Sequence, residues 1–269
     1  MRLLSLNAWG GNVFEPLMAY LQQADADIVC LQEVTSAAEP SPERLYFKGH
    51  GWDLAQHADL FAAVRTLLPG HQAVFCPAME GDLFDADGRA YRSRFGLATF
   101  VRDEFAVLGQ AQAFVHGTYR SGGWGEPPVP RNMHALRLFD PASRRGFVVA
   151  HLHGLRDLDG KHDSPARDAQ AHRVVEMIDQ VREDGDPVVF GGDLNLLPDS
   201  RSFAIWAEAG LSDLITGRGF TDTRTSLYPK EQRHADYLLV SEGISVAGFD
   251  VVTAPEVSDH RPLVLDFSV

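Results

Sequence analysis

Short apolar runs rich in β-branched residues follow one another along nearly the whole chain, whereas few stretches have helical periodicity. The predicted strands are residues 3–7, 27–32, 73–77, 96–101, 106–115, 135–139, 146–151, 187–191, 235–240, 245–252 and 262–267. The large number of predicted strands relative to helices argues against a fold in which one helix follows each strand. Turn-forming pairs such as Asp87-Gly88 and Asp140-Pro141 favour antiparallel hairpins. The pattern therefore predicts an α/β fold in which sheets pack face to face beneath outer helices.

The clearest predicted helix begins after Ser164-Pro165, an N-cap residue followed by a proline at the first helical position, and ends before Gly185. Other helices are predicted over residues 15–23, 53–68 and 202–209. Residues 36–51 and 116–132 are rich in turn formers and are predicted to be long loops, which are usually functional or disordered. We find no repeat, low-complexity tract or linker, so residues 1–269 are expected to form one domain.

The composition is typical of a folded protein that does not depend on disulfides. Hydrophobic residues make up 45% of the 269 residues and charged residues 23%, which argues against intrinsic disorder. The cysteines, Cys30 and Cys76, lie in apolar runs and are expected to be buried, reduced thiols. The N-terminal apolar stretch is too short for a signal peptide, and no run approaches the ~18 apolar residues of a membrane span. These features predict a cytoplasmic protein.

The net charge restricts the kinds of partner. Asp and Glu number 37 against 24 Lys and Arg, which gives a formal charge of -13. A protein that holds DNA by neutralising many phosphates needs the opposite sign. An anionic substrate must therefore be held locally, by a few arginines or by a metal ion.

Polar residues with metal or phosphate chemistry stand where the predicted strands begin or end. They are Asn7, Glu33, Asp193, Asn195, Asp236, Asp259 and His260. Burying such groups costs free energy unless ligands or partners satisfy them. A carboxylate directly after a buried strand, such as Glu33, is a good ligand for a hard cation. Asp193 and Asn195 are two residues apart and would share a face if the strand continued.

Taken in order, these segments resemble the endonuclease/exonuclease/phosphatase family. The matching motifs are Leu6-Asn7-x-Trp9-Gly10, Leu31-Gln32-Glu33, the strand with His151, Gly192-Asp193-x-Asn195-x-x-Pro198, Asp236-Tyr237-x-x-x-Ser241 and Ser258-Asp259-His260-x-Pro262-Leu263. The resemblance implies a four-layer α/β sandwich of the deoxyribonuclease I type, with two mainly antiparallel sheets flanked by helices. It further implies a metal-dependent hydrolase of phosphoric esters.

The same resemblance assigns roles to individual residues. Glu33 would be the principal ligand of Mg²⁺ or Mn²⁺, with Asn7 and Asp259 near the same ion or its waters; an oxygen-rich set suits such hard cations. Asp193 would orient or deprotonate the attacking water, and Asn195 would hold a phosphoryl oxygen. Paired with Asp236, His260 would stabilise the charge of the transition state.

Two histidines on one strand, His151 and His153, allow a second interpretation as a zinc hydrolase. A metallo-β-lactamase pattern would need Asp and His where Leu155 and Arg156 stand, which disfavours zinc. The family resemblance gives His151 a catalytic role, and His153 is expected to support the site or contact substrate. Further expected substrate contacts lie in or after the long loop and are Tyr119, Arg120, Trp124 and Arg131, with solvent exposure as the alternative.

Three functions follow from these observations. The first is a metal-dependent phosphoesterase that acts on a mono- or diester of a small molecule or lipid head group. The second is a nuclease for single-stranded or short nucleic acid, which the net charge disfavours. Trp9 also argues against a DNA-repair enzyme, because apurinic endonucleases have an acidic residue there. The third is a catalytically idle binding module, against which stands the retention of mutually repelling acids such as Glu33, Asp193 and Asp259.

Overall fold

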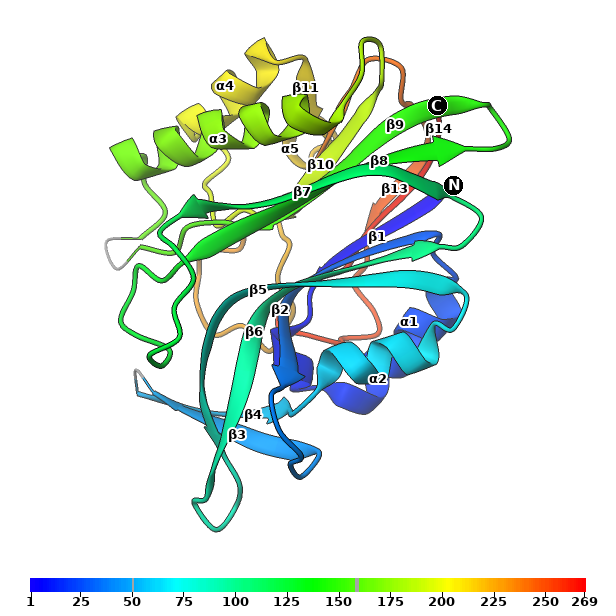
Figure 1. Cartoon of the computed structure of the whole chain (residues 1–269). Coiled ribbons are helices and arrows are strands. Elements are labelled where there is room, and N and C mark those ends of the chain that lie inside the picture. Colours follow the sequence, from blue (N-terminus) through cyan, green and yellow to red (C-terminus); the bar gives the residue numbers. More distant parts are fainter. Residues whose placement is uncertain (50, 158–159) are drawn as a thin grey trace.

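The computed structural model describes residues 1–49, 51–157 and 160–269, and its strands form two sheets packed against each other (Figure 1). The first sheet has the strand order β13(Ser245–Val251), β14(Leu263–Ser268), β1(Arg2–Asn7), β2(Ile28–Ala37), β6(Ala90–Arg102), β5(His71–Phe84), β3(Arg44–Gly49) and β4(Trp52–His57). The second has the order β11(Leu211–Asp213), β12(Asp236–Ser241), β10(Val188–Asp193), β9(Arg145–His153), β8(Arg131–Asp140) and β7(Ala106–His116). Neighbouring strands are antiparallel except for the parallel pairs β1–β2 and β9–β10.

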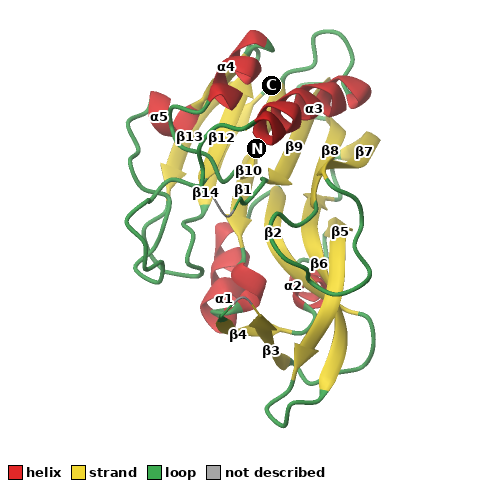
Figure 2. Cartoon of the chain, turned by 90° about the vertical axis from the view of Figure 1, so that its left-hand side faces the viewer, coloured by secondary structure: helices red, strands yellow, loops and turns green. Residues whose placement is uncertain are grey.

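Helices cover the outer face of each sheet, as Figures 1 and 2 show. They are η1(Trp9–Gly11), α1(Phe14–Ala24) and α2(Leu60–Leu67) with the first sheet, and α3(Pro165–Val181), α4(Arg201–Glu208) and α5(Leu214–Gly217) with the second. This arrangement confirms the predicted four-layer fold class. No helix among the described residues combines the length and apolar character needed to cross a bilayer.

Side-chain alternation along the strands divides the core between the layers. In β1, Leu3 faces the apolar core between the two sheets, whereas Leu4 and Leu6 join the core beneath α1 and α2. Full burial of one such side chain contributes roughly 1.5–3 kcal/mol to the free energy of unfolding. Cys30 and Cys76 are buried and free, as predicted.

Residues 44–57 differ from the sequence-based prediction. The expected loop contains β3, and the helix predicted from residue 53 begins only at Leu60. Residues 52–57 pair with β3 as strand β4 instead. The local reason is Asp59, whose carboxylate accepts a hydrogen bond from the amide of Ala62 at 3.0 Å and so caps α2. The short elements β11 and α5 were also outside the prediction, because so few residues leave no detectable periodicity.

The two parallel pairs determine where the polar strand ends meet. In the first sheet, Asn7 at the end of β1 is in register with Gln32 of β2. In the second, Asp193 at the end of β10 is in register with His153 on one side and Asp236 on the other. The Asn7 amide nitrogen donates to Asp193 Oδ2 at 2.9 Å, so the two sets of strand ends are joined across the sheets.

Candidate active site

Glu33 owes its position to an irregularity within β2. The register between β2 and β6 shifts between Leu31 and Val34, and Glu33 has φ 53°, in the left-handed region. This conformation costs a non-glycine residue roughly 1–2 kcal/mol, and a bulge of this kind redirects a side chain out of the strand alternation. Backbone strain of this type concentrates at functional sites.

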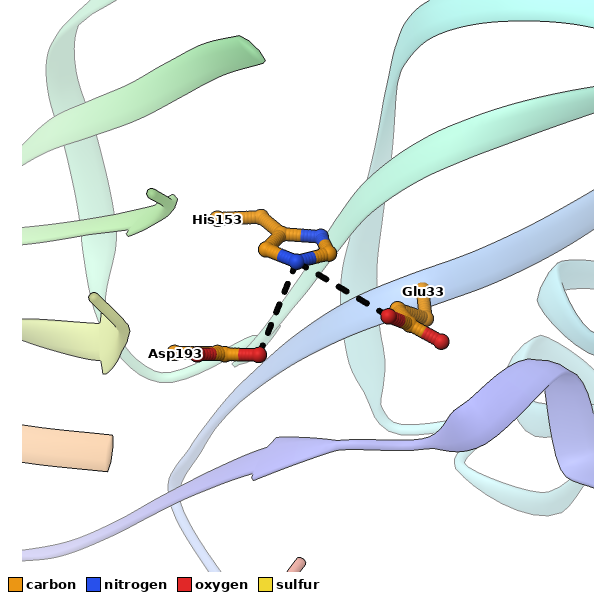
Figure 3. A group of neighbouring side chains, drawn as sticks. All are labelled: Glu33, His153 and Asp193. Carbon is orange, nitrogen blue, oxygen red and sulfur yellow. Dashed lines mark ion pairs between the residues drawn. The ribbon is translucent and has the colours of Figure 1, made fainter. Parts of the chain in front are cut away.

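Asp193 lies at the centre of a buried cluster that both sheets supply. His153 Nε2 lies 3.5 Å from Asp193 Oδ2 and 3.7 Å from Glu33 Oε1, so the ring points between the two carboxylates (Figure 3). His260 Nε2 approaches Asp193 Oδ2 to 3.6 Å. The structure therefore brings together Asn7, Glu33, Asp193 and His260, which the sequence placed far apart.

His260 is held by Asp236. Its Nδ1 lies 2.8 and 2.9 Å from the two Asp236 carboxylate oxygens, and its backbone amide donates to Ser258 Oγ at 3.2 Å. Burial lowers the pKa of His260, but the charges of Asp236, Asp259 and Asp193 together outweigh burial and the pKa is raised overall. The expected Asp236–His260 pair is thus present, with Nε2 directed toward Asp193.

The carboxylates of the cluster differ in charge environment. Burial and the nearby charge of Asp259 raise the pKa of Glu33. Burial also acts to raise the pKa of Asp193, but His260 and the other neighbouring cations bring it below its ordinary value. Buried carboxylates that repel one another, as Glu33 and Asp259 do, are a suitable environment for a divalent cation.

In the part of the chain that the structure describes, two groups of side chains offer ligand atoms within 4.8 Å of one another: Glu33, His153 and Asp193, and separately Asp193, Asp236 and His260. In the second group Asp236 already holds the His260 ring, which leaves the carboxylates of Glu33 and Asp193 in the first group as the oxygen donors for a hard cation. Of the other expected ligands, Asn7 Oδ1 accepts from the Trp9 amide at 3.0 Å. The last expected ligand, Asp259, receives a hydrogen bond at 2.8 Å from Arg224.

Asn195 reaches the site by a turn rather than by continuation of the strand. Strand β10 ends at Asp193, and Asn195 adopts φ 53°. The turn is held by the Asn195 amide, which donates to Asp193 Oδ1 at 3.1 Å, and by Arg167 of α3, which donates to the Asn195 carbonyl at 2.9 Å. Because β10 ends at Asp193, the condition under which Asp193 and Asn195 would share a strand face is not met.

His151 lies apart from this cluster, between the two sheets. Its Nε2 lies 2.8 Å from Thr99 Oγ1 and its Nδ1 lies 3.2 Å from Gln32 Nε2. Burial lowers the pKa of His151 well below the usual range. His153, two residues nearer the strand end, contacts Glu33 and Asp193, whereas the sequence analysis gave the catalytic role to His151 and a supporting or substrate-side role to His153.

Residues of the 116–132 loop divide into two groups. Arg131 is buried at the start of β8, with Nη1 3.4 Å from His153 Nδ1. Tyr119 and Trp124 instead contact β5: the Tyr119 hydroxyl donates to Glu80 Oε2 at 3.1 Å, and Trp124 Nε1 donates to the Asp82 carbonyl at 2.8 Å. Arg120 is joined to β5 through its backbone. The contacts that hold these three residues thus lie on the extended end of the first sheet.

Two cations beside the cluster were not among the sequence-based candidates. Arg224 Nη1 contacts both Asp259 and His260 Nε2. The Lys161 ammonium contacts the carbonyl of His234 and lies 3.2 Å from Gln232 Oε1, and burial lowers its pKa to about 8. Both residues lie in irregular segments without a recognisable motif, so only the folded chain reveals their position.

Residues 4–260 match the family model described as Endonuclease/Exonuclease/phosphatase family. The uncharacterized protein YbhP of Escherichia coli strain K12 is 24% identical over 248 residues, which cover 90% of this chain and 83% of YbhP.

Solved structures with similar folds include the mannosyl-6-phosphatase Bt3783 of Bacteroides thetaiotaomicron VPI-5482, with TM-score 0.68 and 18% identity over 100% of both chains. A second is D. rerio TDP2 complexed with single strand DNA product, with TM-score 0.66 and 16% identity over 100% of this chain and 99% of that one. At these identities the likeness to solved structures establishes the fold alone.

Proposed function

The chain belongs to the endonuclease/exonuclease/phosphatase family, and on this premise we propose that it is a divalent-metal-dependent phosphoesterase. The observation that carries the proposal is the convergence on Asp193 of Asn7, His153 and His260, with Glu33 beside them. The proposed reaction is in-line attack of an activated water on a phosphate ester.

Glu33 is the proposed principal ligand of Mg²⁺ or Mn²⁺, with Asn7 and Asp259 next to the same ion or its waters. The donor set fits because carboxylate and amide oxygens are the ligands that hard cations prefer. Such an ion, when bound, polarises a phosphoryl oxygen and stabilises the leaving oxygen. The positive charge of such an ion would also offset burial and the repulsion by Asp259, which together raise the pKa of Glu33.

Asp193 is the proposed residue that orients the attacking water. Its neighbouring cations keep its carboxylate ionised near neutral pH, so it accepts a hydrogen bond from that water. Asn195, fixed by the turn after β10, is proposed to hold a phosphoryl oxygen through its side-chain amide. The raised pKa of His260 favours the imidazolium, whose positive charge is proposed to stabilise the developing negative charge, while Asp236 fixes its ring.

His153, rather than His151, is the proposed histidine of the second sheet that contacts the phosphoryl group. Arg131 has only N–H donors, so its contact makes His153 Nδ1 the acceptor and leaves the ring proton on Nε2. Burial lowers the pKa of His153 well below its ordinary value, which keeps the ring neutral. A neutral ring with its proton on Nε2 donates to an oxygen placed between Glu33 and Asp193.

The proposed substrate is a phosphoester of a small molecule or lipid head group, and the alternative is single-stranded or short nucleic acid. Bt3783 is a mannosyl-6-phosphatase, which supports the first, and TDP2 was captured with a single strand DNA product, which supports the second. The formal charge of -13 favours the first. A cytoplasmic location remains a prediction.

Replacement of Asp193 tests the mechanism. We expect Asp193→Asn to lower kcat for an aryl phosphate in Mg²⁺ or Mn²⁺ by about a thousandfold or more, because the amide cannot accept the water's hydrogen bond as a carboxylate does. Steady-state kinetics would measure it, with Asp179→Asn on the outer surface of α3 as the matched control. Chelation should abolish hydrolysis.

Retention of the wild-type rate by Asp193→Asn would remove the mechanism. Calorimetric titration with Mg²⁺ and Mn²⁺ distinguishes the phosphoesterase from the remaining alternative, a catalytically idle binding module. The enzyme should bind a divalent ion at millimolar concentration, whereas the binding module has no need to.

A further inference from the structure

A row of contacts crosses the candidate active site and has an arginine at each end. Arg131 Nη1 lies 3.4 Å from His153 Nδ1, and His153 Nε2 lies 3.5 Å from Asp193 Oδ2. From the same Asp193 oxygen, His260 Nε2 lies 3.6 Å away, and its nitrogen contacts Arg224 Nη1. The two guanidinium groups come from β8 and from the segment before β12, so the tertiary structure alone places them at one site.

Among the described residues, neither guanidinium group has a hydrogen-bond acceptor for all of its N–H donors. Arg131 and Arg224 are each only 5% exposed, and the Nε atom of each is buried without a hydrogen-bond partner among the described residues. Within the described ranges, Nη2 of either arginine also has no protein acceptor. A buried cation with unused N–H donors is costly unless an anionic ligand supplies the missing acceptors.

Lys161 adds a third cation from a third segment of the chain. Its ammonium is held by Gln232 Oε1 and the His234 carbonyl, in the segment that leads into Asp236. Arginine recognises phosphate through several parallel hydrogen bonds, whereas lysine acts as a point charge. Two guanidinium groups and one ammonium therefore offer more donors than the two terminal oxygens of a diester require.

We propose that the substrate is a phosphate monoester, whose dianionic terminal phosphoryl group is bound between Arg131 and Arg224. This inference rests on the proposed phosphoesterase function and specifies its substrate class. A monoester has three terminal oxygens and close to two negative charges at neutral pH, because its second pKa is about 6. A diester has a single charge, and its second substituent must also fit at the phosphorus.

The direct test compares two substrates with one leaving group, 4-nitrophenyl phosphate and methyl 4-nitrophenyl phosphate. For the wild-type protein in Mg²⁺ or Mn²⁺, we expect kcat/KM to be at least about tenfold higher for the monoester, the effect of one additional charged hydrogen bond. Equal or faster hydrolysis of the diester would overturn the inference while leaving the proposed function intact.

Binding of non-reacting anions tests the same inference without turnover. With Mg²⁺ present, calorimetry should give inorganic phosphate a Kd at least about tenfold lower than that of dimethyl phosphate. If neither aryl ester is hydrolysed, the proposed function fails, and equal affinity for the two anions would then reject the preference for a dianion as well.

Variants of the two arginines test whether these residues cause the preference for the monoester. Arg224→Gln and Arg131→Gln should each lower the monoester-to-diester ratio of kcat/KM by about tenfold or more, and Arg224→Lys should restore part of it. The control is Arg137→Gln on the same strand as Arg131, because Arg137 pairs with Asp186 and Glu183 away from the site. Equal losses for both substrates in the two arginine variants would overturn the assignment. The wild-type ratio decides the substrate class even if a variant does not fold.

Discussion

His151 and His153 lie two residues apart on β9, and their rings contact different groups. His153 is at the strand end, where its Nε2 lies 3.7 and 3.5 Å from the carboxylates of Glu33 and Asp193. His151 lies deeper between the sheets, against Thr99 and Gln32. Both rings are buried. The two histidines have the same residue type and lie on the same face of β9. Their different distances from the end of the strand therefore decide which of them contacts the acidic cluster.

The surroundings of His151 form a hydrogen-bonded chain with one consistent direction. Gln32 Nε2 donates to His151 Nδ1, which leaves the His151 Nε2 proton for Thr99 Oγ1. The Thr99 hydroxyl then donates to His134 Nδ1 at 2.7 Å, and His134 Nε2 donates to Gln110 Oε1 at 3.3 Å. Every ring in this inner chain is neutral and partnered at both nitrogens. Its end at Gln32 is next in sequence to Glu33, so it supports the site from beneath.

Within this comparison of the two histidines, the largest expected effect is that of replacing His153. His153→Phe keeps a ring of similar size but removes the Nε2 donor, so we expect kcat to fall about 100- to 1,000-fold, as for other transition-state donors. Steady-state kinetics with an aryl phosphate would measure the change, and urea unfolding would verify that the variant is folded. A kcat within threefold of wild type would place His153 with His151 among the residues that act only on stability.

The second effect concerns the inner chain. Thr99→Val preserves side-chain shape but leaves a donor of His151 and an acceptor of His134 without partners, which should lower the free energy of unfolding by about 2–4 kcal/mol. Thr66→Val on the exposed face of α2 is the control and should change it by less than about 0.5 kcal/mol. Urea denaturation provides both values. A loss of activity without a loss of stability in Thr99→Val would contradict the division between the two regions.

The smallest effect is a pH dependence of stability. Burial lowers the pKa of His134 to about 4 and lowers that of His151 as well. An unfolded histidine has a pKa of about 6.5, so unfolding takes up protons between these values and the folded state loses stability as pH falls below 6.5. His134 alone should lower the free energy of unfolding by about 2 kcal/mol when the pH falls from 7 to 5.

Urea unfolding at pH 7 and pH 5 would measure this dependence. His134→Gln should reduce the difference between the two pH values, whereas His172→Gln on the exposed side of α3 should not. An unchanged difference in His134→Gln would show that other groups cause the acid sensitivity.

The sequence was sufficient for the fold class because periodicity and turn residues are local properties. Ser164 and Pro165 predicted the start of α3, and Ser164 does accept from the Arg167 amide at 3.3 Å. The acids Glu33, Asp193 and Asp236 stood out because burying a carboxylate next to an apolar strand costs free energy unless a ligand or partner satisfies it. The helix predicted over residues 53–68 was wrong in its first part. There the chain forms β4, which depends on pairing with β3 rather than on a sequence pattern of its own.

The contributions of Arg131 and Arg224 were decided only in three dimensions. Their proximity to His153 and His260 depends on β8 and on an irregular segment, and no local pattern records such contacts. The sequence by itself determined the layers, the strand ends and the chemical types gathered there, since these follow from alternation and side-chain identity. The tertiary structure decided which histidine faces the carboxylates and which cations accompany it. Those outcomes depend on the bulge at Glu33 and on register between distant strands, which are set by packing over the whole chain.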